Sequence, residues 1–188
     1  MQEPSAYGTP AYNPNQPSPH SLKNKLVRVI WNFVWLALYR PSPKPLHKWR
    51  CFLLRLFGAK VGKGVHPYPS AKIWAPWNLE MDDGSCLADN TDCYCVNKIR
   101  IGKNSTVSQY SYLCGATHDY EHPLMPLVSA PIMIGDNVWI TADVFIAPGV
   151  TIHDGAVVGA RSSVFSDVNA WCVVAGNPAK FIKKRTLK

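Results

Sequence analysis

His118 is the residue of this chain best suited to acid–base chemistry. It lies within residues 116–120, which read ATHDY. A neutral imidazole, whose ordinary pKa is about 6.5, can take a proton from a hydroxyl group near neutral pH. The position of His118 in the sequence fits equally well a surface histidine that has no catalytic role. An acidic neighbour would orient the ring; Asp92, Asp119 and Glu121 are candidates, and the sequence does not choose among them.

Two other kinds of chemistry are disfavoured. Cys114 lies four residues before His118, which suggests a Cys–His pair with the cysteine as nucleophile. The repeat described below disfavours this, because it points Leu113 inward and makes Cys114 part of the wall of the fold. A zinc ion held by three histidines needs a ligand near residues 81–101, where there is none. The six cysteines form no Cys-x-x-Cys pair. We therefore expect no metal.

Residues 134–169 repeat every six positions. The first position is aliphatic six times: Ile134, Ile140, Ile146, Ile152, Val158 and Val164. The fifth is always small: Val138, Val144, Val150, Ala156, Ser162 and Val168. The third and fourth collect Asp, Asn, Gly and Pro, which form turns. A period of six fits neither a helix nor a simple alternating strand. It predicts an all-β solenoid in which three sixes make one triangular coil of short parallel strands.

Less regular sixes extend this solenoid back to about Val61, with two-residue slips after Leu79 and before Ile101. Residues 117–131 leave the register and are too long for a corner. We expect them to protrude as a loop with His118 at its root, and a loop on a rigid scaffold is where function is commonly found. Asn177-Pro178 is expected to break the solenoid. The sequence thus predicts a β-helix at 59–170 and a basic extension at 171–188.

The positive charge is concentrated before the solenoid. Between Pro4 and Leu79 there are eleven Lys or Arg and no Asp or Glu, whereas residues 80–188 hold nine basic and eleven acidic residues. This asymmetry predicts an anionic partner near the N-terminus. A membrane surface fits better than nucleic acid, because the basic residues alternate with Trp, Leu and Phe.

The segment before the solenoid divides into a tail and two helices. Residues 1–20 are rich in Pro and are expected to be disordered. Residues 21–58 are expected to be amphipathic and helical. The apolar run at 29–39 is too short to cross a bilayer, which takes about 20 residues. We expect it to lie in a membrane interface with Trp31 and Trp35 at headgroup depth; packing on the solenoid end or on another subunit is the alternative.

A second helix is expected at 47–57, after a Pro-rich linker. Its apolar residues recur at helical spacing and should cover the first coil. They are Trp49, Phe52, Leu53, Leu56 and Phe57. The first twenty residues contain no apolar signal-peptide core, and the thiols are taken as reduced. The sequence therefore indicates a cytoplasmic protein, with peripheral contact to the inner membrane face as an option.

Several motifs accompany the repeat. They are Trp49-Arg50, residues 53–60 (LLRLFGAK), 75–79 (APWNL), Ser108-Gln109, 112–114 (YLC), 117–120 (THDY), 135–150 and 175–180 (AGNPAK). With them, the chain from about residue 22 resembles the hexapeptide-repeat O-acetyltransferases, most closely the colanic-acid and exopolysaccharide branch. The resemblance implies a left-handed parallel β-helix, a homotrimer and acetyl-CoA as co-substrate. It also implies acetylation of a sugar hydroxyl on an exopolysaccharide precursor, with a sugar or a lipid-linked oligosaccharide as acceptor.

The resemblance also implies roles for individual residues. His118 would be the general base of a direct transfer without an acyl-enzyme. Trp139, Ala142, Gly159 and Ala160 would line the pantetheine arm between two neighbouring solenoids, and a backbone N–H near Ala142 would hold the oxyanion. Lys180 and Lys183 would face the phosphates of the nucleotide. Asp92 and Asn97 would contact the acceptor.

Two other functions use the same solenoid. A γ-type carbonic anhydrase-like protein holds zinc with three histidines, but the histidines after His66 are only His118, His122 and His153. A non-catalytic trimeric β-helix binding module would be indicated by loss of the loop histidine or of the closing motif at 176–180. Both are present in this chain, which favours the enzyme.

Overall fold

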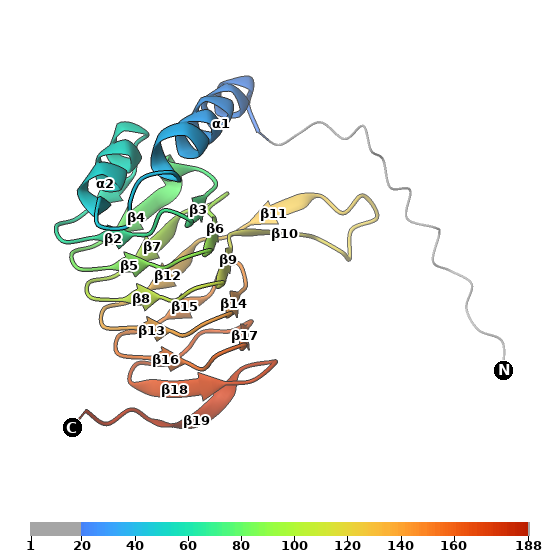
Figure 1. The fold of residues 1–188 in the computed structure, drawn as a ribbon. Helices are drawn as coiled ribbons and strands as arrows, with labels where there is room; N and C mark the ends of the chain where they lie inside the picture. Colours follow the sequence, from blue (N-terminus) through green and yellow to red (C-terminus); the bar gives the residue numbers. More distant parts are fainter. Residues whose placement is uncertain (1–19, 188) are drawn as a thin grey trace.

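The computed structural model describes residues 20–187, so the tail expected at residues 1–20 lies, apart from His20, outside the described residues. Three sheets form a solenoid whose coils stack one on the next (Figure 1). The first sheet contains β1 (Lys60–Val61), β4 (Leu79–Met81), β7 (Ile99–Ile101), β12 (Ile132–Ile134) and β15 (Thr151–Ile152). The second contains β2 (His66–Pro67), β5 (Cys86–Leu87), β8 (Thr106–Val107), β13 (Trp139–Ile140), β16 (Val157–Val158), β18 (Cys172–Ala175) and β19 (Lys180–Lys184). The third contains β3 (Lys72–Ile73), β6 (Asp92–Tyr94), β9 (Tyr112–Cys114), β14 (Phe145–Ile146) and β17 (Ser163–Val164).

The strands of each sheet stack coil upon coil in parallel register. On β13, for example, Trp139 lies between Thr106 of β8 and Val157 of β16. The aliphatic first positions of the sixes, such as Ile140, are fully buried. The small fifth positions, such as Val144, are buried as well. The predicted parallel solenoid is therefore confirmed, and its core is the stacked columns of these two positions.

The C-terminal end of the solenoid lies further along the chain than expected. Strand β18 pairs in parallel with β16, so the second sheet continues past residue 170 to Ala175. Strand β19 then turns back antiparallel to β18. Arg185 fastens this terminal ribbon by donating to the carbonyls of Asn137 and Gly155, both at 2.9 Å. The expected boundary at 170 was wrong because the sequence of β18 keeps an alternating strand pattern after the sixes end.

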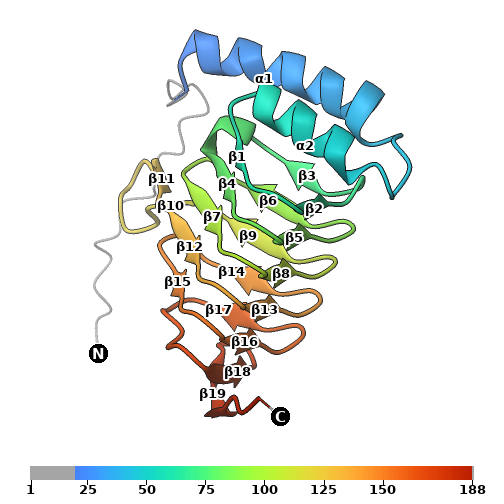
Figure 2. The ribbon, with the colours of Figure 1, turned by 90° about the vertical axis from the view of Figure 1, so that its left-hand side faces the viewer.

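Helices close the other end of the solenoid (Figure 2). They are α1 (Leu22–Val34), the π-helical turn η1 (Trp35–Tyr39) and α2 (His47–Leu56), with a short 3-10 turn η2 (Pro76–Asn78) in the first coil. Ser21 caps α1 by accepting a hydrogen bond from the Asn24 N–H. Among residues 20–187, none of these helices has the length and hydropathy needed to cross a bilayer.

The two tryptophans expected at a membrane surface instead anchor α1 and η1 to the first coil. Trp31 is fully buried and its indole donates to the Ile73 carbonyl at 2.6 Å. The Trp35 indole donates to the Ala71 carbonyl at 2.9 Å. Packing on the solenoid end, the stated alternative, is therefore what the structure shows for this face of the helix.

Helix α2 covers the first coil as expected, but its face is rotated: of the five residues expected to point inward, Leu53 is buried and Phe57 packs against the core. Its buried residues are Arg50, Cys51, Leu53 and Leu54. Trp49, Phe52 and Leu56, which were expected to point inward, are exposed. The helix is rotated because the Arg50 guanidinium must reach main-chain carbonyls beneath it, including that of Pro67 at 2.7 Å.

Candidate active site

The segment that leaves the six-residue register forms a hairpin rather than an irregular loop. Strands β10 (Ala116–His118) and β11 (Leu127–Ser129) pair antiparallel, with His118 opposite Leu127. The hairpin protrudes sideways from the solenoid (Figure 1). It emerges between β9 of the third sheet and β12 of the first sheet, which we call the hairpin corner. Ala116 is buried at its root, so a rigid base carries an exposed histidine.

The His118 ring is held by a main-chain carbonyl. Its Nδ1 lies 2.7 Å from the carbonyl oxygen of Met125, on the other arm of the hairpin. A carbonyl can only accept, so Nδ1 carries the hydrogen and donates it. In a neutral imidazole this leaves Nε2 with the free lone pair. The hairpin therefore fixes the ring in the tautomer in which Nε2 can act as a base.

The His118 ring is hydrogen-bonded to the Met125 carbonyl and to none of the three candidate carboxylates, Asp92, Asp119 and Glu121. Asp92 pairs with the Lys72 ammonium at 3.3 Å. Asp119 accepts from the Glu121 backbone N–H at 3.1 Å within the hairpin turn. The orienting group is instead the Met125 carbonyl, at a residue with a left-handed φ of 41°.

The Cys–His pair and the zinc site are not formed either. The Cys114 thiol is buried and donates to the Ala116 carbonyl at 3.0 Å, whereas the His118 ring reaches toward Met125. Within residues 20–187, no three His, Cys, Asp or Glu side chains are grouped so that they could hold a metal ion. A zinc set of three histidines is thus not assembled within the described part of one chain.

A second group of predicted residues lies on the second sheet and at the corner that follows it. Trp139 on β13 is 50% exposed, and its indole donates to the Ser108 hydroxyl at 3.1 Å. Ala142 lies in the next turn, where its carbonyl accepts from the Arg161 N–H at 3.0 Å. Among residues 20–187, no hydrogen bond uses the Ala142 N–H, so this donor is available to an incoming oxygen. We call this corner the Ala142 corner.

Gly159 and Ala160 occupy the equivalent turn one coil further on. Ala160 is exposed. A Cβ at Gly159 would lie 2.8 Å from the Ala175 Cβ, a distance at which one of the two backbones has to move. The glycine at this position therefore has a packing reason of its own, in addition to any role toward a ligand.

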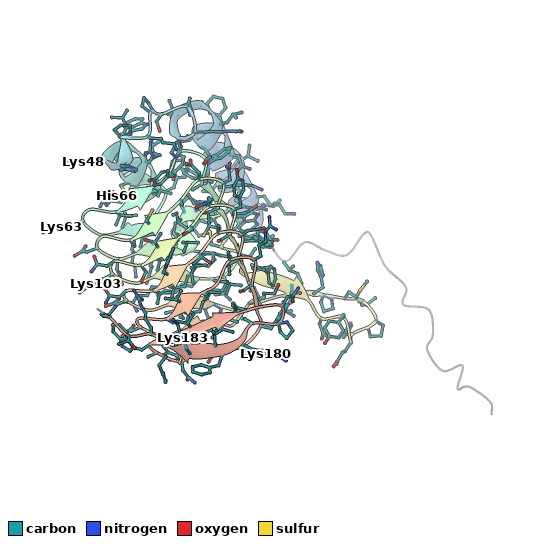
Figure 3. The ribbon with its side chains drawn as sticks, turned by 60° about the horizontal axis from the view of Figure 1, so that its bottom comes forward. Lys48, Lys63, His66, Lys103, Lys180 and Lys183 are labelled. Carbon is teal, nitrogen blue, oxygen red and sulfur yellow. The ribbon has the colours of Figure 1, made fainter. Side chains whose placement is uncertain are left out.

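Lys180 and Lys183 extend this surface toward the C-terminal end. They lie on β19, opposite Ala175 and Val173 of β18, and are exposed. Figure 3 shows both on the terminal ribbon, with Lys103 on the solenoid and Lys63 nearer the helical end. Two ammonium groups at this place can hold phosphate groups of a ligand that lies along the second sheet.

Known proteins share these features. Residues 131–166 match the family model described as bacterial transferase hexapeptide (six repeats). Over 156 residues the chain is 47% identical to WcaF of Escherichia coli K12, named as a colanic acid biosynthesis acetyltransferase; the match covers 83% of this chain and 86% of that protein. The chain belongs to the hexapeptide-repeat acetyltransferases. It is therefore an acyltransferase, and its solenoid is the left-handed parallel β-helix of that family.

Solved structures of other hexapeptide-repeat acetyltransferases have the same fold. A maltose O-acetyltransferase from Clostridium difficile 630 superposes with a TM-score of 0.75 at 27% identity, covering 89% of this chain and 90% of that one. The acetyltransferase VCA0836 from Vibrio cholerae, solved with acetyl-coenzyme A, gives 0.80 at 23% identity, covering 91% and 93%.

A single chain of this acetyltransferase separates the predicted site residues into two groups. His118 and Asn97 share the hairpin corner, where the Asn97 amide donates to the Ser129 hydroxyl at 3.2 Å. Asp92 lies on β6, a strand that leads to that corner. The other six residues lie on the second sheet and at the Ala142 corner: Trp139, Ala142, Gly159, Ala160, Lys180 and Lys183. The third sheet separates the two groups, so one copy does not bring them together.

Sequence reasoning missed three groups at these two places. The Met125 carbonyl is a main-chain atom, and nothing in the sequence marks it as the partner of His118. Ser129 meets Asn97 only because the hairpin folds back to its root. Ser108 directly follows β8, and Trp139 lies on β13, which pairs with β8 one coil further on. Counting the sixes across the hairpin would have paired these two strands.

Proposed function

We propose that this acetyltransferase transfers the acetyl group of acetyl-CoA to a sugar hydroxyl of an exopolysaccharide precursor, with His118 as the general base. The observation that carries the proposal is the Met125 carbonyl contact, which leaves Nε2 of an exposed histidine ready to accept a proton. The likeness to WcaF supports a polysaccharide acceptor. The acetyl-CoA seen in the related Vibrio cholerae structure supports the donor.

The proposed reaction is a direct transfer. Nε2 of His118 removes the hydroxyl proton as the acceptor oxygen attacks the thioester carbonyl, and the Ala142 N–H donates to the oxyanion that forms. Collapse of the tetrahedral intermediate breaks the carbon–sulfur bond. The imidazolium then returns its proton to the departing CoA sulfur, so the base is regenerated and no acyl-enzyme forms.

The proposal requires more than one copy of the chain. Since the third sheet lies between the hairpin corner and the Ala142 corner of one copy, a complete site forms when the hairpin of one copy meets the Ala142 corner of the next. Such head-to-tail contacts close into a ring, and a homotrimer is the ring we propose.

An aromatic column on the third sheet supports this assembly. Trp74, Tyr94, Tyr112, Phe145 and Phe165 follow one another along the outer face of the sheet, with neighbouring ring centroids 5.5 to 6.3 Å apart. Burial and then the neighbouring Cys114 raise the pKa of Tyr112 above its usual range, which keeps this phenol neutral. A neutral aromatic face between the two corners is suited to contact with a neighbouring subunit.

In the proposed trimer, Trp139, Ala142, Gly159 and Ala160 line the pantetheine arm, and Lys180 and Lys183 bind the phosphates. Asp92 and Asn97 contact the acceptor, which is a free sugar, a nucleotide sugar or a lipid-linked oligosaccharide. The six cysteines are all free thiols, which fits a reducing compartment. We place the reaction in the cytoplasm.

The test is an acceptor screen that follows CoA thiol release. Purified enzyme with acetyl-CoA is offered nucleotide sugars and lipid-linked oligosaccharides, and acetylated product is identified by mass. His118→Ala is expected to lower turnover on the best acceptor by roughly 10²–10⁴-fold while the Kd for acetyl-CoA stays within about twofold.

His118→Gln is the matched variant, because its amide nitrogen can still donate to the Met125 carbonyl without supplying a base. It is expected to be as inactive as His118→Ala. Turnover near that of the unaltered enzyme in either variant would remove His118 from the mechanism. Failure of every sugar acceptor while another class of hydroxyl compound is acetylated would overturn the acceptor assignment.

A further inference from the structure

The helical end of the molecule exposes an apolar face that its packing does not use. On α1, Trp31 points into the solenoid, and the opposite side presents Leu22, Leu26, Val29, Ile30 and Phe33. These five follow at i, i+4, i+7, i+8 and i+11, so they form one stripe along the helix. Leu26, Val29 and Phe33 are 63%, 66% and 70% exposed. In a soluble protein, the side of a helix that faces away from the core is normally polar. In α1 this side is apolar.

Helix α2 continues this face. It lies beside α1 across the end of the solenoid (Figure 2). It exposes Phe52 and Leu56. Trp49 joins α2 to η1, which directly follows α1, because its indole donates to the Leu38 carbonyl at 3.0 Å, and its ring stacks on Phe52. We call the α1 stripe together with Trp49, Phe52 and Leu56 the apolar platform. Contiguous exposed apolar surface of this kind marks a site of interaction.

The platform is bordered by positive charge. Lys23 and Lys25 flank the stripe on α1, and Lys48 flanks it on α2 at helical spacing, whereas the Arg55 guanidinium turns back to the Val61 and Gly62 carbonyls. Residues 20–79 contain no Asp or Glu. Among residues 20–187, none of the salt bridges involves a residue of α1 or α2. The charges at this border are therefore not neutralised within the described part of the chain.

We propose that the apolar platform docks the protein on an anionic lipid bilayer surface. Apolar side chains enter the headgroup region, and the flanking Lys side chains extend to the phosphates, as in helices that lie in a membrane interface. A symmetric pairing of two copies through the platform would place the two basic borders against each other, so charge favours the lipid surface over a second copy. The inference does not rest on the proposed acetyl transfer.

The experiment is co-sedimentation of the full chain with vesicles. Vesicles of equal parts phosphatidylglycerol and phosphatidylcholine are expected to bind the protein at least about tenfold more tightly than pure phosphatidylcholine, and binding is expected to weaken at high salt. Leu26→Glu with Phe33→Glu is expected to weaken binding by about 100-fold or more, because two apolar contacts are replaced by charges that the surface repels.

Phe181→Glu with Ile182→Glu is the matched control. These residues are 59% and 58% exposed on β19, at the opposite end of the solenoid, and the net charge changes by the same amount. The control pair is expected to keep vesicle binding within about threefold. Acetyl transfer to a water-soluble acceptor, measured in parallel, is expected to be unchanged by the α1 variant, which separates this inference from the proposed function.

Three results would overturn the proposal. The first is that the unaltered protein fails to bind anionic vesicles. The second is that the two double variants lose binding equally, which would mean that net charge alone matters. The third is that the α1 variant changes the mass of the assembly in light scattering while no vesicle binding is seen, which would mean that a second copy covers the platform.

Discussion

Replacing Arg50 is expected to loosen the helical end of the solenoid. Its side chain is fully buried, yet among residues 20–187 it forms no salt bridge with a carboxylate. The Nε donates to the Pro67 carbonyl at 2.7 Å, Nη1 to the Ser42 hydroxyl and the Pro43 carbonyl, both at 2.8 Å, and Nη2 to the Lys44 carbonyl at 2.5 Å. One side chain thus ties α2 to the first coil and to the linker that leads back to α1.

The magnitude follows from the groups that Arg50→Ala leaves without a donor. They are three main-chain carbonyls, and an unsatisfied buried acceptor costs about 1–3 kcal/mol. Pro43 and Lys44 are at the surface, so water can reach their carbonyls, whereas Pro67 is buried. We expect Arg50→Ala to lower the free energy of unfolding of this end by about 1–3 kcal/mol, the cost of the one buried carbonyl that loses its donor. Arg50→Lys keeps the charge but loses the planar fork, so about half that loss is expected.

The assay is urea unfolding followed by tryptophan fluorescence, since Trp31 and Trp35 both bond to the first coil. All samples are compared at one chain concentration, and the transition that involves the helical end is the one scored. Lys48→Ala, an exposed substitution on the same helix, is the control and should change stability by less than about 0.5 kcal/mol. If Arg50→Ala costs under about 1 kcal/mol, the guanidinium does not hold this end together.

Two further predictions concern charged groups along the solenoid. Hydrogen bonds from Lys60 and then Lys98, each 2.8 Å from a carboxylate oxygen, lower the pKa of Glu80. The stability that these contacts add to the folded state is therefore fully present above the ordinary pKa of 4.5 and is lost as pH falls through the lowered pKa. Glu80→Gln should cost less than about 1 kcal/mol at pH 7 and flatten the decline of stability below pH 4.5 in urea unfolding, and identical pH curves for both proteins would contradict this. Lys180→Ala with Lys183→Ala should raise the KM for acetyl-CoA about 3–10-fold and change kcat less than about twofold; an unchanged KM in steady-state kinetics would exclude both lysines from phosphate binding.

The solenoid could be predicted from the sequence because its physical constraint is repeated at every coil. A position such as Ile140 or Val144 must be aliphatic or small in order to stack on its equivalents in the neighbouring coils. The residue types of the sequence therefore repeat every six positions. The end at Ala175 was missed because β18 still pairs with β16 after the strict repeat stops.

The packing of the helices could not be predicted from the sequence pattern. Helix α2 has apolar residues on two sides, and periodicity cannot tell which side a partner covers. The side that is covered includes Arg50, whose guanidinium donates to carbonyls of the linker before α2 and of the first coil after it. His118 has the same limit. Its residue type indicates acid–base chemistry, but no feature of the sequence indicates that the main-chain carbonyl of Met125 fixes its tautomer.

The most direct test of the central claim is complementation between two inactive chains. His118→Ala removes the base from the hairpin corner, and Ala142→Phe blocks the Ala142 corner. If the site lies between copies of a trimer, co-expression in equal amounts gives about three quarters mixed trimers, each with one intact site out of three. About one quarter of the unaltered turnover is expected from the mixture, and almost none from either variant alone. A mixture as inactive as its two components, with mixed trimers shown by mass, would contradict it.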